Sequence, residues 1–217
     1  MKHKAYILRT CDHDMKSYGG FQWPMSGIVK APDWRADVKC GRGLHGFLWG
    51  EGYGDLANWS ENAKWVVAGI SEWIDLDGKV KFPEAEVVFV GSRYDATNFI
   101  RELGARGAVI GSTVTGGNCS TVTGGDRSTV TGGVGSTVTG GVGSTVAGGD
   151  RSTVTGGYRS TVTGGDDSTV TGGVNSIMQV KWHDGNRYRI AVAYVGEDGI
   201  EPNVPYRVEN GKFVKVN

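Results

Sequence analysis

An octapeptide repeated eight times in tandem is the feature that most constrains how this chain folds. The copies occupy residues 112–175 and read S-T-V-T-G-G-x-x, and their first six positions differ only at Ala147, which replaces a threonine. Strict identity at six positions and freedom at two is typical of a stacked strand-and-turn unit. One octapeptide buries too little apolar surface to offset the ordering of its backbone. The repeats therefore predict a short β-solenoid, stable only through stacking.

Alternation within S-T-V-T predicts which side chains face the solenoid core. Side chains of a strand alternate between its faces, so serine and valine share one face and the two threonines the other. The valines are the only apolar side chains available, and we expect them to form the core: Val114, Val122, Val130, Val138, Val146, Val154, Val162 and Val170. The threonines then form an outward ladder. We expect the Gly-Gly pair to supply positive φ angles at a tight corner, with the variable pair solvated there.

Two architectures satisfy an eight-residue period. In the first, one chain forms a flattened coil of two octapeptides per turn. In the second, three chains intertwine and each contributes one octapeptide per turn. The phrase V-T-G-G-D-R-S-T resembles the V-x-G-x-x-x-x-x needle repeat of phage tail-lysozyme proteins, which implies the second. We favour the single chain because compact segments flank the repeats. The sequence does not exclude the three-chain architecture.

The repeats divide the chain into three parts. We expect the fold class to be mainly β. Residues 1–110 are expected to form a small α+β head domain, residues 111–176 the solenoid, and residues 177–217 a β-hairpin cap. The head strands are expected near Lys4–Leu8, Gly43–Trp49, Trp65–Ile70, Trp73–Asp77, Lys79–Phe82 and Ala85–Val90. One helix is expected from an N-cap at Asp95 to Gly104, and a short one after Ser60. Asp184-Gly185 and Asn210-Gly211 predict two hairpins with type I′ turns.

Composition narrows the class of protein. The 23 basic and 23 acidic residues balance, so the chain has no basic footprint for nucleic acid. No apolar run approaches the roughly 18–20 residues of a membrane-spanning helix, and the N-terminus lacks the pattern of a signal peptide. Three cysteines at irregular spacing do not form a disulfide framework. These observations predict a cytoplasmic protein that contacts neither nucleic acid nor membrane.

Two resemblances concern the repeats and the whole chain. The phrase G-Y-R-S-T-V-T-G (Gly157–Gly164) resembles the octapeptide unit of bacterial ice-nucleation proteins, which implies an outward threonine ladder as an ice-binding face. The phrases S-Y-G-G-F-Q-W-P (Ser17–Pro24), C-G-R-G-L-H-G-F-L-W-G-E-G (Cys40–Gly52) and the tail Tyr194–Val208 resemble a family of uncharacterised bacterial and bacteriophage proteins. That family pairs a Trp-rich head with octapeptides. It implies a phage setting in the host cytoplasm and no known activity.

The head domain offers weak signals of chemistry. Cys11, His13, Cys40 and His45 are potential zinc ligands, but their spacing is not that of a zinc finger and no Cys-x-x-Cys is present. We expect neither a metal nor a cofactor. The phrase Gly43-Leu44-His45, with Arg9-Thr10 and Ser17-Tyr18 upstream, resembles the NAD-binding core of ADP-ribosyltransferases. A downstream glutamate motif is missing, so an enzyme is the less favoured hypothesis.

The favoured function is non-enzymatic binding of a protein partner, with the solenoid as a rigid scaffold and a host macromolecule as the target. Aromatic residues are enriched at interface centres, and the solenoid corners are free to vary. The candidate binding residues are Tyr18, Phe21, Trp23 and Trp34 in the head, and Asp126, Arg127, Asp150, Arg151, Tyr158 and Arg159 at the corners. A monomer or a homo-oligomer is expected. The alternatives are an ADP-ribosyltransferase-like enzyme and, third, ice or surface binding through the threonine ladder.

Overall fold

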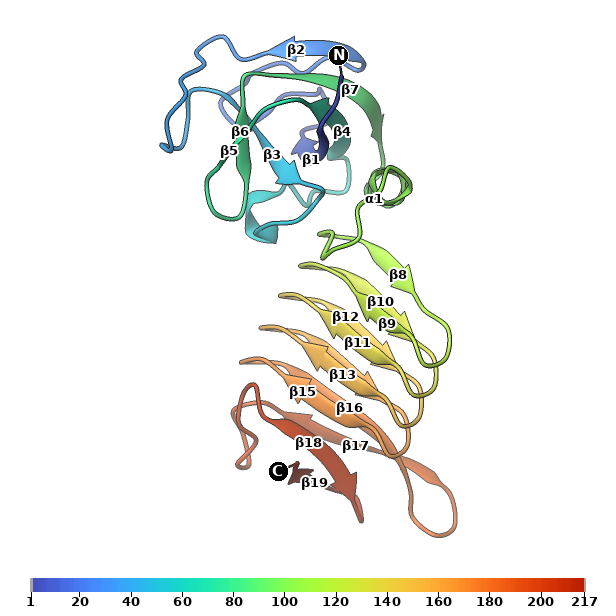
Figure 1. The fold of residues 1–217 in the computed structure, drawn as a ribbon. Helices are drawn as coiled ribbons and strands as arrows, with labels where there is room; N and C mark the ends of the chain where they lie inside the picture. The colour runs from blue at the N-terminus through green and yellow to red at the C-terminus, as the bar shows by residue number, and fades with distance from the viewer. Residues whose placement is uncertain (1, 217) are drawn as a thin grey trace. The chain divides into compact units, whose positions relative to one another are not determined.

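The computed structural model describes residues 2–216 (Figure 1) and divides into two compact units, residues 1–110 and residues 111–217. The first unit is an α+β head, and the second is a β-solenoid with its C-terminal hairpins. Each unit has its own core.

The head is built on one antiparallel sheet of seven strands in the order β2-β7-β4-β1-β3-β6-β5. The strands are β1 (Ala5–Cys11), β2 (Gly27–Lys30), β3 (Leu44–Leu48), β4 (Lys64–Ile70), β5 (Ile74–Asp75), β6 (Val80–Phe82) and β7 (Glu84–Gly91). Central β1 and β4 are apolar on both faces, since Ile7 and Val66 pack in one buried cluster and Leu8 and Val67 in another. All six expected strands are present, and β2 and the 3₁₀ turn η1 (Gly54–Leu56) are additional.

A single helix, α1 (Arg93–Glu102), packs Ala96 and Ile100 into one of the two clusters. Its N-cap is Ser92, three residues before the Asp95 expected from sequence. The Ser92 hydroxyl accepts the Asp95 N–H at 3.2 Å and donates to the Asp95 carboxylate at 2.6 Å, so the two residues cap the helix reciprocally. Gly104 follows the helix with φ +121°.

The short helix expected after Ser60 does not form. The Asn58 side chain instead accepts both the N–H and the hydroxyl of Ser60. A single turn then leads into β4 at Lys64, because the apolar run that follows is used by the sheet.

The solenoid is a single-chain coil of two octapeptides per turn (Figure 1). Its eight short strands are β8 (Thr113–Thr115), β9 (Thr121–Thr123), β10 (Thr129–Gly132), β11 (Thr137–Gly140), β12 (Thr145–Gly148), β13 (Thr153–Gly156), β14 (Thr161–Gly164) and β15 (Thr169–Gly172). Each strand from β8 to β14 pairs in parallel with the strand sixteen residues later, so that Val130 lies beside Val146 and Val138 beside Val154. Strand β15 instead pairs antiparallel with a C-terminal strand. The intertwined three-chain alternative is therefore not adopted.

Valine and serine line the solenoid interior as expected. Val130 and the five later repeat valines are fully buried, Val122 is nearly so, and Val114 at the first rung is partly covered. The serines are buried as well, except Ser120, which is half-buried. Each inner serine hydroxyl bonds a backbone carbonyl nineteen residues earlier, as Ser144 does with Gly125 at 3.1 Å. The buried hydroxyl is thereby satisfied, which explains why the serine does not vary.

The Gly-Gly pair has a different role from the one expected. Neither glycine has a positive φ in any copy. The left-handed residue is the eighth, including Cys119, Arg127, Arg159 and Asp167. The glycines are required by space. A Cβ on Gly140 would lie 2.5 Å from the Val146 side chain, and one on Gly133 would lie 2.7 Å from the Asn118 backbone nitrogen.

The C-terminal strands continue the stack beyond the last perfect repeat. Strand β16 (Ile177–His183) pairs in parallel with β14, and Met178 takes the place of a core valine. Strand β17 (Tyr188–Tyr194) pairs with β16, and β18 (Pro205–Glu209) and β19 (Lys212–Lys215) extend the other sheet.

One of the two expected type I′ turns is present. Asn210 and Gly211 have φ angles of 50° and 80°, as a type I′ turn requires. The hairpin expected at Asp184-Gly185 also forms, with His183 opposite Tyr188, but its turn is not type I′, because only Gly185 has a positive φ. The Asp184 carboxylate instead accepts the N–H groups of Asn186 and Arg187, both at 2.8 Å.

Candidate functional site

Two outer faces of the solenoid carry threonine ladders, and they differ in continuity. On β9, β11, β13 and β15 the ladder has no break, and we call it the continuous threonine face: Thr121, Thr123, Thr137, Thr139, Thr153, Thr155, Thr169 and Thr171. On β8, β10, β12 and β14 the ladder is interrupted at Ala147, which lies between Thr131 and Thr163. We call this second one the interrupted face. Both present hydroxyl and methyl groups in strict register.

The corner residues expected to bind a partner already have structural roles. Asp126 and Asp150 accept the N–H groups of Val142 and Asp166, each sixteen residues later, at 2.9 Å. Asp150 also pairs with Lys181 at 2.7 Å, and this hydrogen bond is the main cause that lowers the Asp150 pKa. These aspartates join successive coils.

The remaining corner candidates lie at the surface. The Arg159 guanidinium lies 4.9 Å from the Tyr158 ring centroid. Arg127, Arg151 and Arg159 have left-handed backbones. A binding role for any corner residue stays a prediction.

The head contains a cavity of about 730 Å³ that collects residues from distant parts of the sequence. Arg9 and Thr10 come from β1, Ser17, Tyr18 and Phe21 from the following loop, Leu44–Phe47 from β3, and Lys79 from the loop before β6. Arg9, Thr10, Ser17, Tyr18 and His45, on which the transferase resemblance rests, thus line one site. No glutamate is among the described residues that line it, so the glutamate of that resemblance is missing here too.

Arg9 lies in the cavity wall without a carboxylate beside it. Its guanidinium donates to the carbonyls of Thr10 at 3.4 Å and His45 at 2.8 Å, and lies 4.5 Å from the centroid of the Trp23 ring. Burial lowers the pKa of Arg9, and burial raises the pKa of the neighbouring Cys11 thiol. The half-buried Arg9 cation therefore faces a neutral thiol.

His45 is neutral at physiological pH. Burial, followed by the positive charges of Lys79, Arg9 and Lys81, lowers the pKa of His45 to about 4. Its Nε2 atom is buried and has no hydrogen-bond partner among residues 2–216. Such an atom is costly unless a bound group satisfies it.

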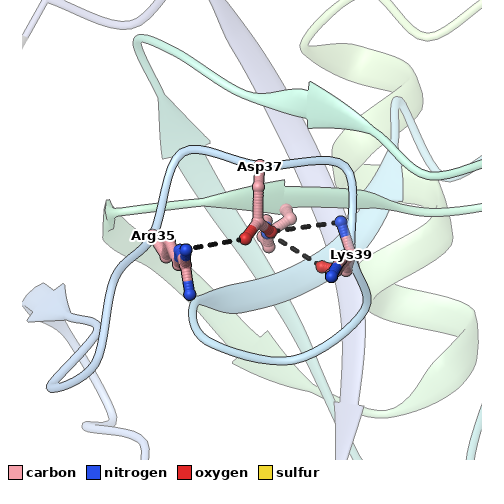
Figure 2. A network of polar contacts seen from close by, with 4 residues as sticks. Arg35, Asp37 and Lys39 are labelled. Carbon is pink, nitrogen blue, oxygen red and sulfur yellow. Dashed lines mark hydrogen bonds and ion pairs between the residues drawn. The ribbon is translucent and has the colours of Figure 1, made fainter.

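A buried lysine supports the loop beside this cavity. Lys81 is fully buried, and its ammonium bonds the Asp37 carboxylate and the Lys39 carbonyl, both at 2.9 Å. Figure 2 shows Asp37 between Arg35 and Lys39, and the Arg35 guanidinium lies 3.2 Å from the Asp37 carboxylate. The bond to Lys81 is the main cause that lowers the pKa of Asp37. This network fixes the 35–39 loop.

The four aromatic candidates separate in the structure. Tyr18 is fully exposed and lines the cavity, and half-buried Phe21 lies beside it. Trp23 is a core residue, 1% exposed, beneath Arg9. Trp34 lies against Lys81, whose ammonium is 5.6 Å from its ring centroid.

Sequence reasoning missed Lys79 as part of this site. Because Lys79 directly precedes a short strand, only the pairing of β6 with β3 brings it to the cavity.

The four potential zinc ligands do not form a metal site. Within residues 2–216, no three His, Cys, Asp or Glu side chains are grouped closely enough to hold a metal ion. Cys11 is buried, and Cys40 is exposed beside the Lys79 ammonium. None of the helices in the described part of the chain has the length and apolar character needed to cross a bilayer.

The fold and these sites define a β-solenoid protein with a separate α+β head. A family model described as "Domain of unknown function (DUF7666)" matches residues 5–102, almost the whole head. The curated relatives are ice nucleation proteins. InaU of Pantoea ananas is 40% identical over 101 residues, which are 45% of this chain and 10% of the relative. A Pseudomonas syringae relative is 41% identical over 45% of this chain and 9% of its own length. No solved structure matches the chain.

These matches support ice-nucleation-like repeats and correct one expectation. The predicted cytoplasmic location is contradicted, because the chain is similar over 45% of its length to ice nucleation proteins, which are surface proteins of the outer membrane. The matches lend no support to a phage origin or to a protein-binding role, so both stay predictions. The chain spans about a tenth or less of the length of these relatives.

Proposed function

We propose that the solenoid binds the surface of ice, or of a similarly ordered crystal, through its continuous threonine face. The observation that carries the proposal is the unbroken register of paired threonines over four strands. Similarity to proteins named for ice nucleation supports it. Sequence reasoning placed this function third, after protein binding and catalysis.

The geometry of the continuous face suits a regular surface. Threonines of adjacent strands are about 4.8 Å apart, and the two threonines of one strand are about 6.7 Å apart. Thr137 and Thr139 are exposed on a backbone held by parallel pairing on both sides. Side chains that are already ordered lose little conformational entropy on binding. Each threonine presents one methyl and one hydroxyl group at a regular spacing. Such a regular array matches the ordered water of an ice surface better than it matches the disordered water of the bulk liquid.

The number of coils limits the activity to adsorption. Four strands at about 4.8 Å give a face on the order of 20 Å long. The relatives are ten or more times longer than the segment of them that this chain matches. The stabilisation of an ice nucleus grows with the contact area. A single chain is therefore expected to slow the growth of existing ice crystals rather than to start freezing.

An ice recrystallisation assay with the two faces altered in turn tests the proposal. Thr139→Lys with Thr155→Lys places two long charged side chains on the continuous face, and it is expected to abolish the inhibition of crystal growth. Thr131→Lys with Thr163→Lys makes the same change on the interrupted face, and it is expected to retain most of the inhibition. Circular dichroism checks that both variants fold. Absence of inhibition by the unaltered chain, or equal loss in both variants, contradicts the proposal.

A further inference from the structure

The head cavity has a charge imbalance that the solenoid function does not use. Among the described residues, neither Arg9 nor Lys79 forms an ion pair with a carboxylate, although both line the cavity. Arg9 bonds two carbonyls and the Cys11 thiol, and the Lys79 ammonium lies 3.1 Å from the Cys40 sulfur. Both cations are half-buried, and a cation that is partly removed from water without a counter-charge is disfavoured. An anionic ligand would neutralise both groups.

The other lining residues describe the rest of the ligand. Phe21, Leu44 and Leu56 give the cavity an apolar part, and Nε2 of His45 lacks a hydrogen-bond partner. Asp33 and Asp55 also line the cavity, so the anionic group has to be confined to the side of Arg9 and Lys79. The carboxylates of these two aspartates suit hydroxyl or amino groups of the ligand as hydrogen-bond donors. The volume of about 730 Å³ is in the range of small-molecule sites.

We propose that the head cavity binds a small phosphate monoester that carries a flat apolar group, with its phosphate against Arg9 and Lys79. Two unpaired cations suit a doubly charged phosphate better than a single carboxylate. The flat group lies against Phe21 and Tyr18. This assigns a ligand site to the head that is separate from any activity of the solenoid.

Calorimetric titration of the full chain with adenosine monophosphate, adenosine and inorganic phosphate tests the site. The monophosphate is expected to bind saturably and at least about tenfold more tightly than adenosine, since a charged hydrogen-bonded pair is lost without the phosphate. Arg9→Met removes the guanidinium but keeps an unbranched apolar side chain, and it is expected to weaken binding at least about tenfold. Lys79→Met is expected to weaken binding to the same extent. Because Lys79 lies in a loop, this substitution does not put folding at risk.

Lys30→Met is the matched control, because Lys30 is exposed on β2 and does not line the cavity. If Lys30→Met weakened binding of the monophosphate as much as the cavity variants do, the loss would come from the change in net charge alone. That result would overturn the proposed site. Lack of saturable binding by adenosine monophosphate, or binding of adenosine as tight as that of the monophosphate, would overturn it as well. Neither result would affect the proposal for the threonine face.

A separate observation concerns β17, the terminal strand of the sheet that carries the interrupted face. Four large apolar side chains project from it into solvent: Tyr188, Ile190, Val192 and Tyr194, which are 58%, 58%, 48% and 52% exposed. Edge strands are usually protected by charges or proline. The one charged residue of β17, Arg189, lies on the opposite face and pairs with Asp184.

The backbone of β17 is prepared for pairing with another strand. The N–H of Val195 bonds the Ser176 carbonyl on the β16 side at 2.9 Å. Antiparallel pairing alternates, so the odd-numbered residues of β17 face β16 and the even-numbered ones face outward. Ile190 and Val192 therefore direct their N–H and carbonyl groups away from the sheet. The Tyr194 carbonyl is already used by the Glu197 N–H.

We propose that β17 pairs antiparallel with β17 of a second copy of this chain, around a twofold axis at Ala191. The sequence Y-R-I-A-V-A-Y is nearly palindromic. In this register Ile190 lies opposite Val192 of the second copy, and Tyr188 lies opposite Tyr194. Even-numbered residues meet even-numbered ones, as the alternation requires. All seven residues pair, and a twofold interface of this kind is self-complementary.

Light scattering on the full chain with two double variants tests this register. Ile190→Lys with Val192→Lys sets like charges opposite one another across the axis, and it is expected to convert a dimer to a monomer. Ile190→Lys with Val192→Glu sets opposite charges in the same places and is expected to restore the dimer. Val214→Lys on β19, at the edge of the other sheet, is expected to leave it intact. A monomeric unaltered chain, or equal dissociation of both double variants, would overturn the proposal.

Discussion

The Ser136 hydroxyl donates a 3.0 Å hydrogen bond to the carbonyl of Gly117, nineteen residues earlier. The same oxygen accepts the N–H of Ser120 at 3.3 Å. One buried hydroxyl thus satisfies two backbone groups on neighbouring coils. Ser144, Ser152, Ser160, Ser168 and Ser176 repeat the bond to the carbonyl.

Ser144→Ala is therefore expected to destabilise the solenoid by about 1–3 kcal/mol, because it removes both hydrogen bonds of the buried hydroxyl, one with the Ser128 N–H and one with the Gly125 carbonyl. Thr145→Ala, on the adjacent exposed residue, is expected to change the free energy of unfolding by less than about 0.5 kcal/mol. Urea unfolding followed by circular dichroism measures both. Equal stability of the two variants would show that the serine ladder does not hold the coils.

Gly133→Ala and Gly117→Ala test whether the sixth position is restricted by stacking. A Cβ on Gly133 would lie 2.7 Å from the Asn118 backbone nitrogen, whereas nothing lies within 4 Å of one on Gly117 in the first coil. Overpacking against backbone costs about 1–3 kcal/mol. Only Gly133→Ala is expected to lower the unfolding midpoint. A similar drop in Gly117→Ala would instead indicate a requirement of the local backbone.

The left-handed eighth position predicts a stabilising substitution. Arg151 has φ +57° there, and Gly143 has φ +64° at the same position of its own octapeptide. A residue with a Cβ costs about 1 kcal/mol more than glycine in this conformation. Arg151→Gly is expected to raise the free energy of unfolding, and Gly143→Ala to lower it, by about that amount. Thermal unfolding of the pair measures the two shifts, and the same sign in both would contradict this account.

The half-buried His45 predicts a loss of stability in mild acid. Its pKa is about 4 in the folded head and about 6.5 in an unfolded chain. Between these values the unfolded state binds more protons, so the free energy of unfolding falls as the pH falls from 6.5 to 4. Because the imidazole is only partly buried, we expect a loss on the order of 1–2 kcal/mol. Unfolding midpoints at pH 7.5, 5.5 and 4.5 measure it.

His45→Gln removes the titrating group and is expected to flatten this dependence. Asp184, whose pKa is lowered to about 2 mainly by backbone N–H groups of Arg187 and Asn186, loses its stabilising contribution only between about pH 3.8 and 2. It therefore does not interfere. An unchanged slope in His45→Gln would assign the acid sensitivity to other groups.

The octapeptide alone determined the class of fold and its core. A period of two within S-T-V-T fixes which side chains share a face, and valine is the only apolar side chain available, so the inward ladder from Val122 to Val170 was predictable. The sequence did not determine that a strand pairs with the one sixteen residues later, because the same repeats also fit an intertwined trimer.

Only the tertiary structure decided how the corners and the head site are built. The reason for the Gly-Gly pair lies in the distance to the previous coil and to the next valine, not in the local φ angle, and no local pattern contains such distances. The cavity likewise depends on strand pairing. Leu8 of β1 lies beside Phe47 of β3, and His45 lies opposite Lys81 of β6. Those pairings bring Arg9, His45 and Lys79 together from three separate segments, and local patterns determine periodicity but not which strands pair.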